Sequence, residues 1–226
     1  MKKMIWIITV LAVVGGIIGV FFMPDSVPLR YDMSGNIEAY GSRYNMLLFP
    51  LIVAALACMF TIILNVFEKK EKNAFEDKER AGAEANKKVL GIASFGVVTF
   101  VAILEAVMYY ISYGLTDGGK LSIDPVRIEC ILMGFLFIVL GNFITKTRIN
   151  SVIGVRTSWS MYNDTTWRKT NRLGAYLVIA EGIVIILAAF VLEKVFTVFV
   201  IMMVLLTLII TATIAYSYKV YKEEKG

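Results

Sequence analysis

The sequence of 226 residues contains no histidine and only two cysteines. Without an imidazole, a Ser-His-Asp triad, a histidine-ligated metal site and an ordinary pH switch near neutrality are all excluded. Cys58 and Cys130 lie inside apolar runs far apart in the chain, so a structural disulfide or a cysteine-based zinc site has little support. We expect both to be small buried hydrophobic side chains. The sequence therefore predicts no metal site, no cofactor and no catalytic residue.

Charge is also scarce, because only 18% of the residues are Asp, Glu, Lys or Arg, whereas 58% are hydrophobic. This balance excludes an ordinary soluble globular domain. A bilayer core about 30 Å thick needs roughly 20 apolar residues in a helix. We therefore predict an all-α polytopic membrane protein with six transmembrane helices. The six apolar stretches run over residues 4–23, 46–67, 89–113, 126–144, 173–192 and 196–217.

Lysine and arginine are distributed unequally between the two ends of these predicted helices. Eighteen of the 23 lie at one end, in the amino terminus, the 68–88 and 145–172 connections, and the tail after Ser217. Because cytoplasmic loops of membrane proteins carry the excess of positive charge, both termini are predicted to be cytoplasmic. The net charge of +5 then reflects this bias and an attraction to anionic lipid. No direct binding of nucleic acid is expected.

The connections between the helices divide the chain into three predicted parts. Residues 1–67 form a helical pair with a structured outer loop, residues 68–88 a charged cytoplasmic connector that extends the flanking helices, and residues 89–226 a four-helix domain. Two prolines and a Ser-Gly-Asn turn signal predict that the outer loop is extended and then reverses tightly. It either packs over the outer face or contacts a ligand. Its candidate residues are Pro24, Pro28, Arg30, Asp32, Gly35, Tyr40 and Arg43.

Four polar side chains fall within the predicted spans, namely Glu105, Glu129, Asn142 and Glu181. Burial of charge in hydrocarbon is costly, so intramembrane carboxyl groups are functional candidates. Glu129 lies near the outer end of its span, where an interfacial pair with Arg127 is expected. Glu105 and Glu181 are either protonated or hydrogen-bonded packing groups, or members of a polar ligand or proton path.

The inner loop over residues 141–174, here called the motif loop, combines basic and aromatic side chains. If the chain is helical from Ser160 or Asn163 onward, Trp159, Asn163 and Trp167 share one face, with both indoles at headgroup depth. The guanidinium groups of the arginines beside them can each pair with two oxygens of a phosphate or carboxylate group. An aromatic belt on a positive loop and a site for an anionic headgroup or a peptide both fit this pattern. The candidate binding residues are Asn150, Gly154, Arg156, Thr157, Trp159, Asn163, Trp167, Arg168 and Arg172.

The motif loop resembles the signature of the SdpI family of bacterial multi-pass immunity proteins. The resemblance is carried by the run Ile-Gly-Val-Arg-Thr-Ser-Trp-Ser at 153–160 and by Asn163, Trp167, Thr170, Arg172 and Gly174. The outer segment 24–43 resembles a small domain of unknown function that is often fused in front of this family. The sequence departs from the family pattern at Ser158, Asn171 and Arg30, where proline, histidine and histidine are common.

The resemblance implies a non-enzymatic protein of the bacterial inner membrane that protects the producing cell against a secreted, membrane-active toxic peptide. It also implies a second task, in which a small cytosolic transcriptional repressor is held at the membrane once toxin is bound. The expected partners are membrane lipid, the toxic peptide and such a repressor. The residues alone leave an alternative open, a small proton-coupled transporter or exporter that uses Glu105 and Glu181 as a relay.

Overall fold

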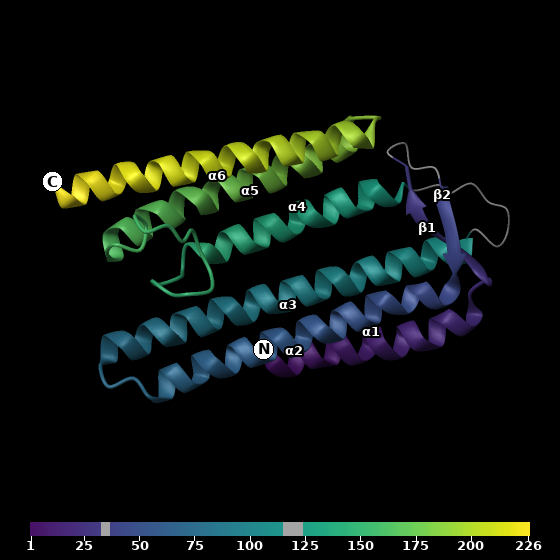
Figure 1. Ribbon diagram of the computed structural model, residues 1–226, viewed down its shortest axis with the longest axis horizontal. Coiled ribbons are helices and arrows are strands. Elements are labelled where there is room, and N and C mark those ends of the chain that lie inside the picture. Colours follow the sequence, from purple (N-terminus) through teal and green to yellow (C-terminus); the bar gives the residue numbers. More distant parts are fainter. Residues whose placement is uncertain (33–36, 115–123) are drawn as a thin grey trace.

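The computed structural model describes residues 1–32, 37–114 and 124–226. Its described part contains six helices long and apolar enough to cross a membrane, which confirms the prediction of an all-α polytopic fold. The helices run side by side along the long axis of the molecule (Figure 1). They are α1 (Lys2–Phe22), α2 (Leu48–Lys72), α3 (Asp77–Gly114), α4 (Pro125–Ile144), α5 (Asp164–Val191) and α6 (Val195–Lys225).

The helices form two groups of three. Helices α1 to α3 pack together, α4 to α6 pack together, and α3 and α4 join the two groups (Figure 1). α5 and α6 are antiparallel neighbours, as their short connection predicted. α2 and α3 extend beyond their apolar stretches and include most of the charged 68–88 connector. Helix α3 packs on α1, α2 and α4. The predicted division of the chain at residue 88 stays a prediction.

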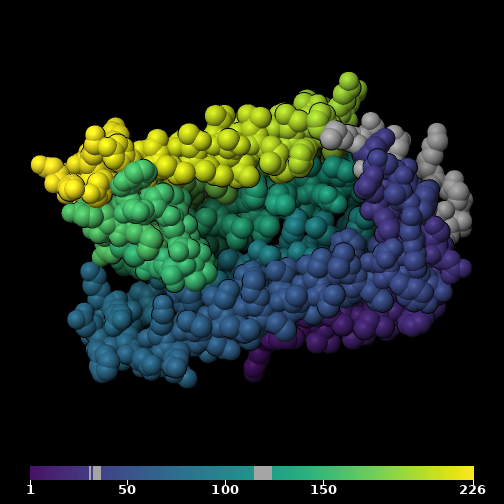
Figure 2. Space-filling model, viewed as in Figure 1, coloured from purple at the N-terminus to yellow at the C-terminus, as the bar shows by residue number. Residues whose placement is uncertain are grey.

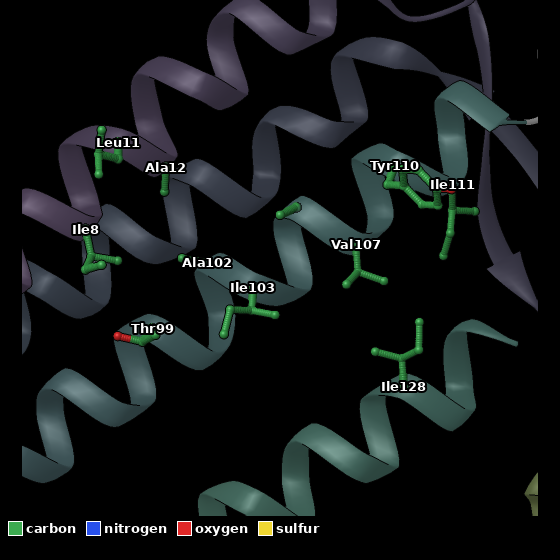
Figure 3. Close-up of a pocket in the computed structure, with 11 residues that line it drawn as sticks. Ile8, Leu11, Ala12, Thr99, Ala102, Ile103, Val107, Tyr110, Ile111 and Ile128 are labelled. Atoms are coloured by element: carbon green, nitrogen blue, oxygen red, sulfur yellow. The ribbon is translucent and has the colours of Figure 1, made fainter. Parts of the chain in front are cut away.

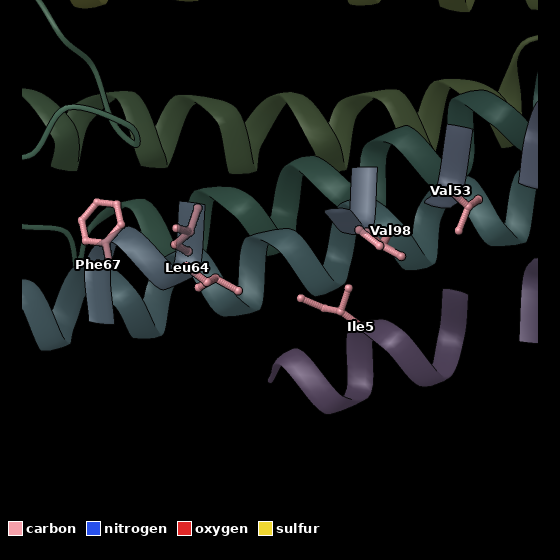
Figure 4. Close-up of a cluster of buried hydrophobic side chains, with 7 residues drawn as sticks. Ile5, Val53, Leu64, Phe67 and Val98 are labelled. Carbon is pink, nitrogen blue, oxygen red and sulfur yellow. The ribbon is translucent and has the colours of Figure 1, made fainter. Parts of the chain in front are cut away.

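The surface of the bundle is apolar, as expected for helices that face lipid. Large hydrophobic side chains such as Phe22 and Val191 are 73% and 77% exposed, and an apolar surface of this extent would be unstable in water. The buried core is comparatively small. In the first group it consists of aliphatic side chains and one phenylalanine between α1, α2 and α3 (Figure 4), namely Ile5, Val53, Ala57, Leu64, Phe67, Leu90 and Val98.

Glycines allow α4 and α5 to approach most closely. A Cβ added at Gly134 would lie 2.7 Å from the carbonyl oxygen of Gly182, and one added at Gly182 would lie 2.5 Å from that of Gly134. Small residues at helix contacts in membranes let two backbones pack against each other. This contact fixes the distance between the two helices that border the motif loop.

The outer 24–43 segment extends and reverses as predicted. Strand β1 (Ser26–Tyr31) pairs antiparallel with β2 (Ile37–Ser42), and the 3-10 helix η1 (Arg43–Leu47) leads into α2. The hairpin lies at the end of the bundle opposite the carboxyl terminus (Figure 1). The predicted turn residue Gly35 lies outside the described residues.

Candidate functional site

The motif loop lies at the end of the molecule where α6 terminates. Figure 2 shows it in green, beside the yellow carboxyl-terminal turns of α6 and above the blue turns that join α2 to α3. It is non-helical from residue 145 to residue 163. The candidate residues within it fall into two classes, distinguished by whether their polar atoms are used inside the loop.

Asn150 folds the first half of the motif loop with its own side chain. Its Nδ2 donates to the carbonyls of Arg148 and Ile153 at 2.7 and 2.9 Å. Its Oδ1 accepts from the backbone N–H groups of Val152 and Ile153, both at 2.8 Å. Such local bonds from asparagine replace regular secondary structure. The amide of Asn150 is therefore occupied by the loop itself.

Asn86 of α3 connects the motif loop to the first helical group. Its side chain is only 6% exposed, and its Oδ1 accepts from the backbone N–H of Arg148 at 2.9 Å. The same oxygen lies 3.5 Å from Nδ2 of Asn150. Because α3 continues without interruption to Gly114, the helix that holds the loop also reaches the opposite end of the bundle.

Gly154 lies where the motif loop folds back onto α5. Its φ of 115° lies in the region that favours glycine, and an added Cβ would lie 2.5 Å from Oδ1 of Asn171. That oxygen accepts from the N–H of Val155 at 2.7 Å, while Nδ2 of Asn171 donates to the carbonyl of Trp167 at 3.0 Å. Trp167 is 2% exposed, and its indole N–H donates to the carbonyl of Thr147 at 3.0 Å. These residues form a closed internal framework.

Thr157 and Ser160 attach the second half of the loop to α6. The N–H of Thr157 donates to Oγ of Ser160, and the N–H of Ser160 donates to Oγ1 of Thr157, both at 2.9 Å. Oγ1 of Thr157 also lies 2.9 Å from Oγ of Ser217 on α6. The ring of Trp159 packs on the ring of Tyr218 with centroids 4.9 Å apart.

The predicted helical face shared by Trp159, Asn163 and Trp167 is wrong, because α5 begins only at Asp164. Asn163 is its N-cap: Oδ1 accepts from the N–H of Thr166 at 2.8 Å, and Oγ1 of Thr166 accepts from the N–H of Asn163 at 3.0 Å. Trp159 precedes the helix and does not share a helical face with Trp167. Trp167 is buried and its N–H donates to a loop carbonyl, so its ring packs inside the protein. The headgroup depth of the two indoles stays a prediction.

The three candidate arginines of the motif loop are exposed, in contrast to this framework. Arg172 donates from Nε to the hydroxyl of Tyr176 at 3.1 Å and lies 5.6 Å from its ring centroid. The ion pairs in the described part of the chain include neither Arg156 nor Arg168. The arginines and the half-buried Trp159 therefore form the face of the motif loop that a ligand can reach.

At the opposite end, Arg43 ties the outer hairpin to α1. Its Nη1 donates to the carbonyl of Met23 at 3.0 Å, and Nη2 lies 3.3 Å from the carboxylate of Asp25. Pro24 is half-buried and Pro28 is buried, so the two prolines contribute to packing. Arg43 therefore acts as a structural anchor between the hairpin and α1.

The exposed side of the hairpin carries an ion pair and an aromatic side chain. Nε of Arg30 lies 2.8 Å from Oε2 of Glu38 across the two strands. The hydrogen bond from Arg30 lowers the pKa of the Glu38 carboxyl, and the half-buried Asp32 partly opposes this effect by charge repulsion. Tyr40 is 60% exposed.

Tyrosine hydroxyls on α3 bind carbonyls of α1 and of the entry to α2. The hydroxyl of Tyr109 lies 3.1 Å from the carbonyl of Gly16 and 3.3 Å from that of Met46. Pro50 has no N–H to offer the Met46 carbonyl four residues earlier, so this carbonyl needs another donor. One turn later in α3, Tyr113 donates to the carbonyl of Gly19.

Two carboxyl groups are buried within the helices. Glu105 is 4% exposed, its Oε1 packs against Gly16, and its Oε2 has no hydrogen-bond partner within the described residues. Glu181 on α5 is 2% exposed, and neither of its oxygens has a partner in that part of the chain. Glu105 faces α1, so the two carboxyl groups belong to different helical groups.

Glu129 and Asn142 lie on the exposed surface of α4. The predicted pair between Glu129 and Arg127 is wrong. Arg127 donates instead from Nη2 to the carbonyl of Glu193 at 2.8 Å and from Nη1 to the carbonyl of Ala189. The carbonyls at the end of α5 lack helical partners, so they compete successfully for this guanidinium.

A groove of about 500 Å³ lies between α1, α3 and α4. Figure 3 shows Ile128 of α4 facing α3 across it, with the α1 side chains on the far wall. Oγ1 of Thr99 is buried without a hydrogen-bond partner in the described chain. The lining is otherwise almost entirely aliphatic, with Ile8, Leu11, Ala12, Ala102, Ile103, Ala106, Val107 and Ile111.

The sequence was compared with protein-family models and with known proteins. Residues 146–217 match the SdpI/YfhL protein family. The chain carries an SdpI-family domain. Residues 7–54, which include α1 and the outer hairpin, match a domain of unknown function, DUF1648. The chain is similar to the protein named Immunity protein SdpI of Bacillus subtilis (strain 168), with 26% identity over 97% of this chain and 95% of that protein. No solved structure gives a significant match.

The sequence alone did not reveal the partners that the motif residues use in the SdpI-family domain. Thr166 had a local signal, since it stands at the third position after an asparagine at a helix start. Asn171 has none, because its bond to Val155 spans a loop of irregular backbone. Asn86 and Ser217 lie 62 and 60 residues from the loop residues that they contact, and no pattern in the sequence pairs them.

Proposed function

We propose that this SdpI-family protein is an immunity protein, which protects the cell that makes it against a secreted, membrane-active toxic peptide. The observation that carries the proposal is the similarity to Immunity protein SdpI along almost the whole of both chains. It extends over both matched domains and the helices between them. The protein is multi-pass, and the proposed location is the bacterial inner membrane.

The proposed contact with the peptide is the exposed side of the outer hairpin. Leu29 and Tyr40 are 41% and 60% exposed there, and Tyr44 on η1 is 56% exposed. An apolar and aromatic surface beside the membrane suits a peptide that itself partitions into lipid. The carboxyl group of Glu105 is buried against Gly16, so the peptide is not proposed to contact it directly.

The proposed route inward is α3. This helix has 38 residues and is therefore roughly 57 Å long. Its outer half holds α1 through Tyr109, and its inner half holds the motif loop through Asn86. A displacement of α3 would change the hydrogen bond between Asn86 and the motif loop, and with it the arrangement of the exposed arginines. A small cytosolic transcriptional repressor is the proposed partner of that face.

Expression in a toxin-sensitive bacterial host tests the immunity function, with the secreted peptides of the encoding strain as the challenge. Wild-type protein is expected to restore growth, and a Leu29→Ser, Tyr40→Ser variant is expected to lose protection at equal abundance in the membrane. Met161→Ser, at an exposed position of the motif loop, is the matched control. Absence of protection by membrane-inserted wild type would exclude the proposal.

The relay is tested separately with Asn86→Ala in a strain that carries a toxin-responsive transcriptional reporter. This variant is expected to protect while the reporter response is lost. Asn142→Ala, an exposed asparagine of α4, should keep both. A normal reporter response in Asn86→Ala would contradict the route through α3.

The second candidate function is proton-coupled transport, which is favoured by the buried oxygens of Glu105 and Glu181 that have no hydrogen-bond partner among the described residues. Proteoliposomes with a pH-sensitive dye inside would show substrate-dependent proton movement. Loss of that movement in a Glu105→Gln, Glu181→Gln variant would support transport. Full protection by the same variant in the growth assay would favour immunity.

A further inference from the structure

A smaller groove lies between Trp159 of the motif loop and one face of α6. It has a volume of about 350 Å³ and is lined by Trp159 and by side chains of α6. The α6 residues follow the first of them by three, four and seven positions, so they occupy one face of the helix. They are Thr211, Ile214, Ala215 and Tyr218.

The same helix face continues to a positive charge. Lys222 follows Tyr218 by one turn, and its Nζ lies 4.9 Å from the centroid of the Tyr218 ring. The distance along the helix from Thr211 to Lys222 is roughly 16 Å. Within the described part of the chain no ion pair includes Lys222. The helix face that lines the apolar groove therefore continues to an ammonium group that forms no ion pair with a described residue.

The indole of Trp159 provides an unused donor at the rim of this groove. The indole N–H of Trp6 donates to Thr61, and that of Trp167 donates to Thr147. No hydrogen bond of the Trp159 N–H occurs among the described residues, although the ring is held firmly against Tyr218. Tryptophan at a membrane boundary uses its ring in the apolar phase and its N–H in the polar phase.

We propose that this groove seats an acyl chain of one anionic phospholipid, whose phosphate is held by Lys222 and by the indole N–H of Trp159. The groove supplies a largely apolar lining for the chain, Trp159 is part of that lining, and the ammonium of Lys222 lies one helical turn beyond Tyr218. Charge complementarity selects an anionic headgroup over a zwitterionic one. The site belongs to the leaflet in which the carboxyl end of α6 emerges, and it does not depend on the proposed immunity function.

A second aromatic pair on α6 offers a matched control. Tyr162 packs on Tyr221 with centroids 5.0 Å apart, and Lys225 lies 5.5 Å from the Tyr221 centroid. This set repeats the chemistry of Trp159, Tyr218 and Lys222 three residues farther along the helix, but it does not line the groove. Diffuse attraction between lysines and lipid would involve both sets equally, whereas a seated lipid requires only the first.

Quenching of tryptophan fluorescence tests the site in the full-length protein. A Trp6→Phe variant leaves Trp159 as the accessible fluorophore beside the buried Trp167. It is reconstituted in vesicles of phosphatidylcholine and phosphatidylglycerol, with bromine on the acyl chains of either lipid at equal mole fraction. The ratio of the two quenching curves gives the preference for the anionic lipid at Trp159.

We expect brominated phosphatidylglycerol to associate about fivefold more strongly than brominated phosphatidylcholine. Lys222→Gln should abolish this preference, and Lys225→Gln should leave it intact. Ala215→Phe, which fills the groove, should reduce quenching by both lipids. Equal association of the two lipids, an equal loss in both lysine variants, or unchanged quenching in Ala215→Phe would each overturn the proposal.

Discussion

The side-chain oxygen of Asn171 accepts a hydrogen bond from the backbone N–H of Val155 at 2.7 Å, and it occupies the space that a Cβ would need at Gly154. The motif glycine and this asparagine therefore require each other. A large part of the motif loop therefore shapes its own backbone, whereas the three candidate arginines are among its exposed side chains.

Gly154→Ala should destabilise the protein by about 1–3 kcal/mol, because alanine at positive φ is strained and its methyl group would displace Asn171. The midpoint of thermal unfolding in detergent measures this effect. Gly15→Ala is the control, since an added Cβ there would meet nothing within 4 Å. Equal midpoints for the two variants would contradict the internal role of Gly154.

Tyr109→Phe should lower the free energy of unfolding by about 1 kcal/mol or more, since the buried carbonyls of Gly16 and Met46 lose their shared hydroxyl donor. The neighbouring Tyr110 is 72% exposed, so Tyr110→Phe is a matched control that should have little effect. Thermal unfolding of both variants in the same detergent provides the comparison. A larger loss in Tyr110→Phe would refute this assignment.

Gly134→Ala should separate α4 from α5 and destabilise the bundle by about 1–3 kcal/mol, since the new methyl group would lie 2.7 Å from a backbone carbonyl of α5. At Gly96, where α3 faces α4, the nearest atom to an added Cβ is 3.8 Å away. Gly96→Ala should therefore be tolerated. Native-state proteolysis of the motif loop reports the difference, and similar cleavage rates would argue against the glycine contact.

The Arg30–Glu38 pair should make the stability of the outer hairpin depend on pH. Because Arg30 lowers the pKa of Glu38, the pair stabilises the hairpin at pH values above the unfolded-state pKa of Glu38, and this contribution disappears as the pH falls through the lowered, folded-state pKa. An NMR titration should show Glu38 titrating below its usual range. In Arg30→Gln the titration should move upward, and no movement would contradict the pairing.

Labelling of single cysteines tests the predicted orientation of both termini. In a background with Cys58 and Cys130 replaced, Tyr40→Cys should react with an impermeant maleimide in intact cells. Tyr162→Cys on the motif loop should react only after the membrane is made permeable. Both tyrosines are exposed in the structure, so accessibility of the side chain does not bias the comparison. The reverse labelling pattern would show that both termini lie outside the cell.

Much of the fold was predictable because each membrane helix satisfies its own backbone and needs only length and hydropathy. The start of α4 was also predictable from Pro125, and Asp124 caps it as local chemistry favours. The role of Arg127 was not predictable. Its nearest carboxylate in sequence is Glu129, but it binds carbonyls more than 60 residues away, in the last turn of α5 and just after that helix.

Hydropathy along the chain predicted six membrane helices and their approximate limits, and the residue order gave the composition of the motif loop. The packing of the helices is what turns Asn150, Gly154 and Trp167 inward while Arg156 and Arg168 remain accessible. The physical reason is that hydropathy is a property of a segment, whereas each polar atom of an irregular loop must find a partner in space. Those partners come from α3, α5 and α6, which only packing brings together.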